Sequence, residues 1–142
     1  MDELSKQVAD KAGRAVDQLG EHSNDSLDYS ESSLSAVEDM LAEASGFTNG
    51  MPEDQIDSLV RIIGSYVLEV GRREFGGKYY WHDEHDQPVL VVGEPDCKIA
   101  ILTFDKVRGR LFGDQADNIP FFYEGFAALA RTAKPGTDVL YI

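Results

Sequence analysis

The sequence predicts an α+β protein in which helices precede and follow a small antiparallel sheet. Two observations carry this prediction. Apolar residues recur at helical spacing through most of residues 4–75, and after Gly76-Gly77 the pattern changes to strand-like alternation and short apolar runs. The chain has 142 residues, of which 42% are hydrophobic, so one domain can bury a core without disulfides or a structural metal.

The first predicted helix spans residues 4–19 and carries a narrow apolar stripe. Gly13 weakens this helix by about 1 kcal/mol relative to alanine. The polar residues 21–28 that follow predict a linker. We therefore expect residues 1–27 to form an amphipathic helix and polar linker that is loosely attached, and residues 28–142 to form a single α+β domain.

Two further helices are predicted before the sheet. Ser30 is a suitable N-cap for the second helix, because its hydroxyl can accept a hydrogen bond from a free backbone N–H, and Gly46 ends that helix. Pro52 suits the first turn of the third helix, which runs to about Phe75. The apolar residues of this long helix extend beyond one stripe, so we expect it to be central and covered on more than one side.

Gly64 and Gly71 lie seven residues apart on one face of the long helix. Each interior glycine destabilises a helix by roughly 1 kcal/mol relative to alanine. The close approach of a strand or another helix would offset this loss. We therefore predict that both glycines are positions where a neighbouring element packs closely.

After Gly77, three segments rich in β-forming residues are separated by short polar turns: residues 78–82, 88–92 and 98–104. They predict an antiparallel meander. Two short helices follow, the first capped by Asp105 and the second opened by Pro120. Residues 139–142 then predict a strand at the edge of the sheet.

The net charge of −13 is unevenly distributed. Residues 1–58 hold 14 acids and three bases, a net charge of −11, and residues 59–142 hold 12 acids and 10 bases, a net charge of −2. Such a field repels nucleic acids and anionic membranes, and it attracts a basic protein surface. The alternative explanation is that acidic helices only keep the protein in solution. Several bases are expected to pair with acids inside the chain: Arg72, Arg73, Lys106, Arg108 and Arg110.

The partner-binding face is expected on the helices of residues 28–57. Glu38, Asp39 and Glu43 avoid the apolar stripe of their helix, and we expect them to be exposed. The predicted partner-binding residues are Glu31, Glu38, Asp39, Glu43, Glu53, Asp54 and Asp57.

One cluster of potential metal ligands stands out, the segment from His82 to Asp86. Two imidazoles and three carboxylates in five residues offer ligands to a divalent metal. The segment falls on the turn of a predicted hairpin, where we expect the side chains to point apart into water. We therefore predict neither a metal site nor a cofactor there.

No residue is predicted to be catalytic. The single Cys97 has acidic neighbours, which disfavour a reactive thiolate, and the chain has no nucleophile elbow, P-loop or dinucleotide fingerprint. Catalysis by a pair of carboxylates stays open, because 26 acids allow many pairs. We expect a cytoplasmic location, since no apolar run approaches the ~20 residues of a membrane helix and the N-terminus lacks the pattern of a signal peptide.

One set of motifs lies between residues 59 and 126: Gly64-Ser65-Tyr66-Val67-Leu68-Glu69, Gly76-Gly77 leading to Trp81, Phe104-Asp105-Lys106-Val107, Arg110 and Gly113. In these motifs the chain resembles uncharacterised small bacterial α+β proteins of the toxin-immunity type. The resemblance implies a protein that binds and blocks a cognate toxin.

The leading interpretation is a non-catalytic cytoplasmic protein that binds a partner with a basic surface, most simply an immunity protein that blocks a basic toxin domain. One alternative is a small intracellular enzyme or metal-binding domain that uses the segment from His82 to Asp86. A pocket converging on His82 or His85 would favour this alternative. A third interpretation is an adaptor or regulatory domain with no toxin involved.

Overall fold

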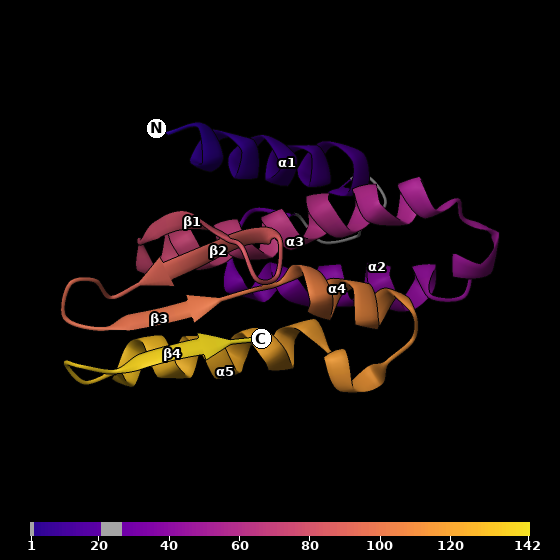
Figure 1. Cartoon of the computed structure of the whole chain (residues 1–142). Helices are drawn as coiled ribbons and strands as arrows, with labels where there is room; N and C mark the ends of the chain where they lie inside the picture. Colours follow the sequence, from indigo (N-terminus) through magenta and orange to yellow (C-terminus); the bar gives the residue numbers. More distant parts are fainter. Residues whose placement is uncertain (1, 21–26) are drawn as a thin grey trace.

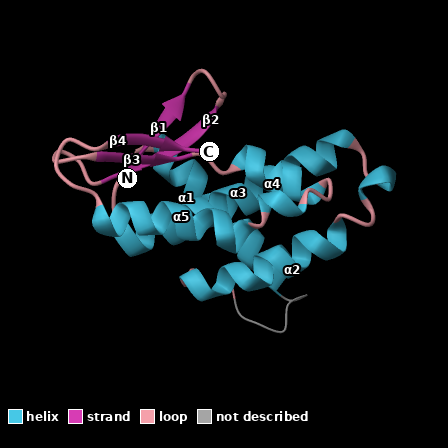
Figure 2. Ribbon diagram, turned by 90° about the horizontal axis from the view of Figure 1, so that it is seen from below, coloured by secondary structure: helices cyan, strands magenta, loops and turns pink. Residues whose placement is uncertain are grey.

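The computed structural model describes residues 2–20 and 27–142, which adopt an α+β fold, as the sequence predicts. The sheet lies toward one end of the molecule, and the connection between α2 and α3 lies at the other (Figures 1 and 2). In chain order the elements are α1 (Glu3–Leu19), the 3-10 turn η2 (Glu31–Ser33), α2 (Leu34–Ala44), η3 (Thr48–Gly50), α3 (Glu53–Phe75), β1 (Lys78–His82), β2 (Gln87–Val92), β3 (Lys98–Ile101), α4 (Phe104–Leu111), η4 (Gln115–Asp117), α5 (Ile119–Thr132) and β4 (Asp138–Tyr141).

Strands β1, β2 and β3 form the predicted antiparallel meander. Leu90 in the middle strand pairs with Tyr79 on one side and with Ile101 on the other. Strand β4 lies at the edge, as expected, but it runs parallel to β3, with Ile99 opposite Val139. The sheet is therefore mixed and not purely antiparallel. The parallel pairing follows because α4 and α5 form a crossover between β3 and β4.

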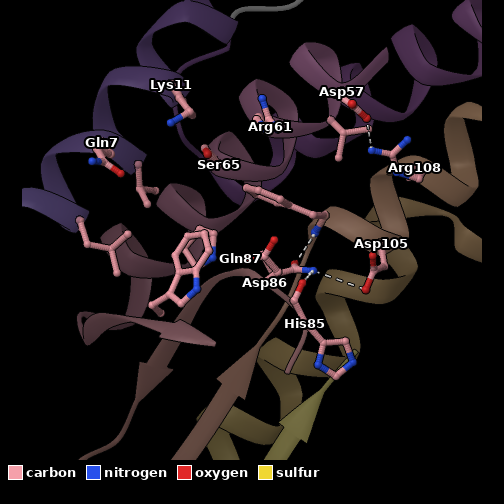
Figure 3. A pocket seen from close by; sticks show the side chains of 16 residues that line it. Gln7, Lys11, Asp57, Arg61, Ser65, His85, Asp86, Gln87, Asp105 and Arg108 are labelled. Atoms are coloured by element: carbon pink, nitrogen blue, oxygen red, sulfur yellow. Dashed lines mark hydrogen bonds and ion pairs between the residues drawn. The ribbon is translucent and has the colours of Figure 1, made fainter. Parts of the chain in front are cut away.

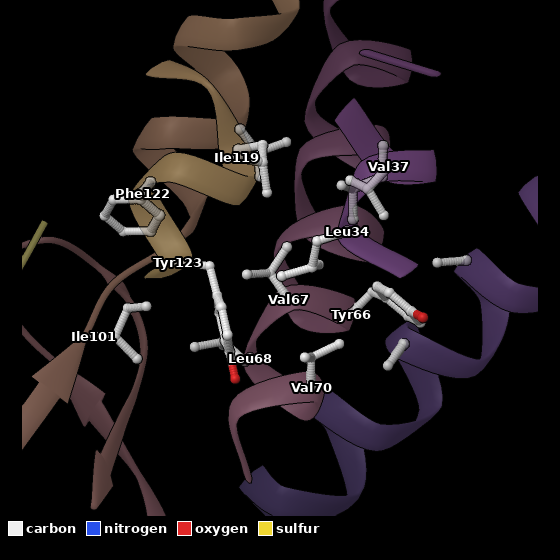
Figure 4. Close-up of a cluster of buried hydrophobic side chains, with 14 of the residues drawn as sticks. Leu34, Val37, Tyr66, Val67, Leu68, Val70, Ile101, Ile119, Phe122 and Tyr123 are labelled. Atoms are coloured by element: carbon white, nitrogen blue, oxygen red, sulfur yellow. The ribbon is translucent and has the colours of Figure 1, made fainter. Parts of the chain in front are cut away.

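Helix α3 is the centre of the core. Every residue from 62 to 71 is buried, because its apolar side chains surround the helix and do not form a single stripe. Figure 4 shows Tyr66 and Val67 of α3 beside Leu34 of α2, with Leu68 on the side of Tyr123 from α5. The prediction that this helix is covered on more than one side is confirmed.

Both interior glycines of α3 are positions of close approach, as predicted. The Phe104 ring occupies the space where a Cβ on Gly64 would lie, and the Thr103 hydroxyl donates a hydrogen bond to the Gly64 carbonyl at 2.8 Å. A Cβ on Gly71 would lie 3.1 Å from Leu90 Cδ2 and 3.4 Å from Phe126 Cε2. The glycines therefore bring α4 and the sheet against the helix backbone.

We expect Gly64→Ala to lower the free energy of unfolding by about 1–3 kcal/mol, because the added methyl group clashes with the Phe104 ring. Gly13→Ala in α1 is the matched control, since a Cβ there meets no atom within 4 Å. It should raise the free energy of unfolding by roughly 0.5–1 kcal/mol through helix propensity alone. Urea unfolding of both variants checks this, and an increase for both would contradict the packing role of Gly64.

Helix α1 packs more firmly than its thin apolar stripe indicated. Val8, Ala12 and Ala15 are 2%, 0% and 1% exposed, and they belong to the same buried cluster as the core residues of α3. Small alanine side chains allow close packing of helices, so a narrow stripe is enough to bury this face. The expected loose attachment is therefore corrected for α1. Residues 21–26 of the predicted linker lie outside the described residues, and the domain boundary at residue 27 stays a prediction.

A buried carboxylate joins α3 to β1. Glu69 is 1% exposed, and its carboxylate accepts hydrogen bonds from Arg72 Nε and from the Tyr79 hydroxyl, each at 2.6 Å. Arg73 Nε lies 3.9 Å from the same carboxylate. Burial raises the pKa of Glu69, but the hydrogen bonds from Arg72 and Tyr79 and the two guanidinium charges outweigh it and hold the pKa below the ordinary value of 4.5. The predicted internal pairing of Arg72 and Arg73 is thus confirmed.

Candidate functional site

The seven acids predicted to bind a partner fall into two groups. Three form ion pairs with arginines of the same chain: Glu31 with Arg131, Glu38 with Arg110, and Asp57 with Arg108. The other four are exposed and have no ion-pair partner among the described residues: Asp39, Glu43, Glu53 and Asp54. Only the second group keeps its full charge available to another molecule.

Glu38 is a structural residue, which corrects the expectation that it is exposed and free. Its Oε2 lies 2.5 Å from Arg110 Nε, and its Oε1 accepts a hydrogen bond from the Ile119 backbone N–H at 3.0 Å. The side chains of Glu38 and Arg110 are 13% and 10% exposed. One carboxylate therefore ties α2 to the end of α4 and to the start of α5.

Glu31 and Asp57 are also paired with arginines, although their side chains are 29% and 34% exposed. Glu31 Oε1 lies 2.5 Å from Arg131 Nη2, while its other carboxylate oxygen is buried, as is the hydroxyl of Tyr123. Burial, together with the nearby Glu31 carboxylate, raises the pKa of the Tyr123 phenol. Asp57 Oδ1 accepts a hydrogen bond from Arg108 at 2.5 Å. These contacts reduce the charge that the two acids present to a partner.

The four remaining acids lie around the connection between α2 and α3, at the end of the molecule opposite the sheet (Figures 1 and 2). Asp39 and Glu43 are in the second half of α2, and Glu53 and Asp54 open α3. Phe47 lies between them in the chain and is 66% exposed. We call Asp39, Glu43, Phe47, Glu53 and Asp54 the acidic end.

Phe47 was not predicted as a binding residue. The sequence did contain a signal for it. Phe47 is an aromatic residue in a loop that contains the turn dipeptide Asn49-Gly50, and it does not belong to the apolar stripe of either neighbouring helix. Two more phenylalanines, Phe112 and Phe121, are 56% and 76% exposed. Phe112 directly follows α4, and Phe121 lies in the first turn of α5.

A second candidate site is a cavity of about 370 Å³ where α1, α3, α4 and the β1–β2 hairpin meet (Figure 3). Ser65 lines it, and this hydroxyl is buried with no hydrogen-bond partner among the described residues. Lys11 and Arg61 also line the cavity, and neither has a carboxylate within 4.0 Å in the described part of the chain. Asp57, Asp86 and Asp105 line the cavity as well, so its walls carry charges of both signs and can hold a small polar molecule.

The same cavity is lined by His85 and Asp86 from the hairpin turn. In Figure 3 the His85 imidazole points away from Ser65 and from the other labelled side chains. The cavity therefore lies beside His85 without converging on its imidazole, and it does not by itself favour the alternative of an enzyme or a metal-binding domain. Sequence reasoning did not find the cavity, because its walls come from four elements that lie far apart in the chain.

The hairpin turn itself differs from the prediction. His82 and His85 do not point apart: their ring centroids are 4.8 Å apart, and their Nδ1 atoms are 3.2 Å apart. One ligand atom each from His82, Glu84 and His85 lie within 4.8 Å of one another. Both imidazoles are half-buried. The expected divergence of these side chains is therefore wrong, and the turn brings together three groups that can coordinate a metal.

Comparison with protein-family models, with curated proteins and with solved structures found no match. Within the described residues, no helix combines the length and the apolarity that a membrane span requires.

Proposed function

We propose that this protein is a non-catalytic binding protein whose acidic end docks on the basic surface of a partner protein. The observation that carries the proposal is Phe47, which is 66% exposed between two pairs of exposed carboxylates that have no ion-pair partner among the described residues. An exposed aromatic side chain flanked in the chain by exposed charges of one sign fits a protein interface.

The charge of the acidic end supports a basic partner. A carboxylate that already has an arginine beside it contributes little to the field outside the protein, whereas Asp39, Glu43, Glu53 and Asp54 add to the net charge of −13. Electrostatic attraction of this kind accelerates encounter and selects partners of opposite charge. The same field disfavours nucleic acids and anionic membranes.

Phe47 supplies the apolar part of the contact. Buried aromatic anchors carry much of the binding free energy at protein interfaces, while surrounding charges set the rate of association and the choice of partner. The Phe47 backbone N–H donates a hydrogen bond to the carbonyl of Ala44 in α2 at 2.9 Å, and the Phe47 carbonyl accepts one from the Gly50 N–H at 3.2 Å, so its backbone is held by α2 and η3. The proposed docking surface therefore combines one aromatic anchor with acids from the two flanking helices, α2 and α3.

We further propose that the partner is a toxin domain and that the protein is an immunity protein of the cytoplasm. The resemblance of residues 59–126 to small bacterial proteins of this type supports the proposal, as does an acidic surface suited to a basic toxin. The single, half-buried Cys97 is compatible with a reducing compartment.

The test is a charge reversal of the acidic end. The fourfold variant Asp39→Lys, Glu43→Lys, Glu53→Lys, Asp54→Lys should associate at least about 10-fold more slowly with the partner recovered by affinity capture from the native host. Raising the salt concentration should slow the wild-type protein and have a much smaller effect on the variant. Phe47→Ser should mainly raise the dissociation rate, because it removes the anchor.

A matched control separates the acidic end from net charge. Asp10, Asp96, Glu124 and Asp138 are exposed acids outside the acidic end, and none has an ion-pair partner in the described part of the chain. Their reversal to lysine adds two charges per position, as the first variant does, so both variants change the net charge from −13 to −5. Equal slowing by the two variants would refute a localised docking surface.

The identity of the captured partner separates the remaining interpretations. A toxin domain supports the immunity role, and a partner without toxic activity supports the adaptor or regulatory role. The alternative of a metal-binding domain rests on different residues, in the turn between β1 and β2.

A further inference from the structure

We propose that His82, Glu84 and His85 bind a divalent transition-metal ion, with Zn²⁺ as the best fit, at the turn between β1 and β2. The proposal goes beyond the binding function of the acidic end and does not depend on it. It rests on the convergence of two imidazoles and a carboxylate, whose ligand atoms lie within 4.8 Å of one another.

The separation of the two imidazole nitrogens matches a metal site. Zinc binds imidazole nitrogen at about 2.0–2.1 Å with tetrahedral angles, so two such nitrogens lie about 3.3 Å apart. The Nδ1 atoms of His82 and His85 are 3.2 Å apart. Glu84 is exposed, and rotation of its free side chain brings a carboxylate oxygen to the third position. A water molecule would then complete the tetrahedron.

The Gln87 side chain holds the turn in this shape without a metal. Gln87 is 3% exposed, and it pairs with His82 across the hairpin. Its side-chain amide donates hydrogen bonds to the His85 carbonyl at 3.3 Å and to Asp105 at 3.4 Å, and its oxygen accepts one from the Phe104 backbone N–H at 3.2 Å. The turn is thereby anchored to α4. Such support orients ligands in advance and raises metal affinity.

The donor set selects the class of metal. Two nitrogens and one oxygen suit Zn²⁺, Co²⁺, Ni²⁺ and Cu²⁺, whereas Mg²⁺ and Ca²⁺ prefer sites built from oxygen alone. The metal would replace two weak contacts of His82 Nδ1, the hydrogen bonds with the His85 backbone N–H and with His85 Nδ1, each at 3.2 Å. Little of the fold changes on binding, because the imidazoles already face each other.

The experiment is calorimetric titration of the untagged full chain with ZnCl₂ at neutral pH. We expect binding of one Zn²⁺ per chain, no competition from excess Mg²⁺ or Ca²⁺, and visible absorption typical of four-coordinate cobalt when Co²⁺ is added instead. The double variant His82→Ala, His85→Ala should weaken binding about 100-fold or more, and Glu84→Gln about 10-fold. Thermal unfolding without metal shows that each variant is folded.

His22→Ala is the matched control, because His22 is the remaining histidine of the chain and is not one of the proposed ligands. It should bind Zn²⁺ as the wild-type protein does. The proposal fails if Zn²⁺ produces no binding heat, since the pair would then be only a hydrogen-bonded contact between imidazoles. It also fails if the double variant binds equally well, or if Ca²⁺ competes with Zn²⁺ at equal concentration, as a merely acidic turn would allow.

Discussion

Replacing Glu38 by lysine should lower the free energy of unfolding by about 4 kcal/mol, whereas the same change at the neighbouring Asp39 should alter it by less than about 0.5 kcal/mol. Glu38 is bonded to Arg110 and to the Ile119 backbone N–H, and the Glu38 and Arg110 side chains are nearly buried. A lysine there would face the Arg110 guanidinium with a like charge and would leave the Ile119 N–H without its partner. Asp39 is exposed and has no such contact in the described structure.

Urea unfolding of the two single variants measures this difference. A further variant, Glu38→Arg with Arg110→Glu, exchanges the two charges and should recover part of the lost stability, because the opposite charges again face each other. Equal, small effects at both positions would show that Glu38 is a surface acid after all. The expected difference explains why the charge reversal of the acidic end leaves Glu38 unchanged: a loss of binding by a partly unfolded variant would say nothing about the docking surface.

Replacing Glu69 by alanine should lower the free energy of unfolding by about 3 kcal/mol at neutral pH. The substitution leaves the buried Tyr79 hydroxyl without its acceptor and Arg72 without its counter-charge. Breaking a buried pair by removing one partner destabilises a protein by about 3–5 kcal/mol. The lower end applies here, because the Arg72 side chain is 34% exposed and water can solvate it. Glu74→Ala is the control, since Glu74 is largely exposed and its nearest base is 3.6 Å away.

The contribution of Glu69 should also depend on pH. The pKa of this carboxyl is lower in the folded protein than its ordinary value of 4.5, so the carboxylate stabilises the fold at pH values above 4.5. As the pH falls through the folded pKa, the carboxylate is protonated and the stabilisation is lost. The difference in unfolding free energy between the wild-type protein and Glu69→Gln should therefore be constant near neutral pH and shrink below about pH 4.5. A difference that grows on acidification would contradict the direction of this shift.

The candidate sites could be predicted from the sequence only in part. Charge composition pointed to an acidic surface on the helices of residues 28–57, and Asp39, Glu43, Glu53 and Asp54 are exposed there. The same reasoning could not separate Glu38 from Asp39, because both avoid the apolar stripe of α2. Their difference depends on Arg110, which is 72 residues further along the chain from Glu38. Pairing at that distance is decided by how α4 packs beside α2.

The conformation of the hairpin turn also could not be predicted from the local sequence. Spacing placed His82 and His85 on one turn, but it could not give the rotamers or the backbone path that bring their rings together. The turn includes Asp86 with φ at 53°, a left-handed conformation that a hydrophobic pattern does not encode. Its anchoring through Gln87 to Phe104 and Asp105 depends on the position of α4.

The sequence by itself determined the α+β class, the meander and the central place of α3, because these follow from the local periodicity of apolar residues and from glycine and proline at the ends of elements. It also indicated that Gly64 and Gly71 are packing positions. Only the tertiary structure decided that β4 runs parallel to β3, that α1 belongs to the core, and which acids remain unpaired. These features depend on contacts between residues far apart in the chain, where the relative position of two elements is set by packing and not by local pattern.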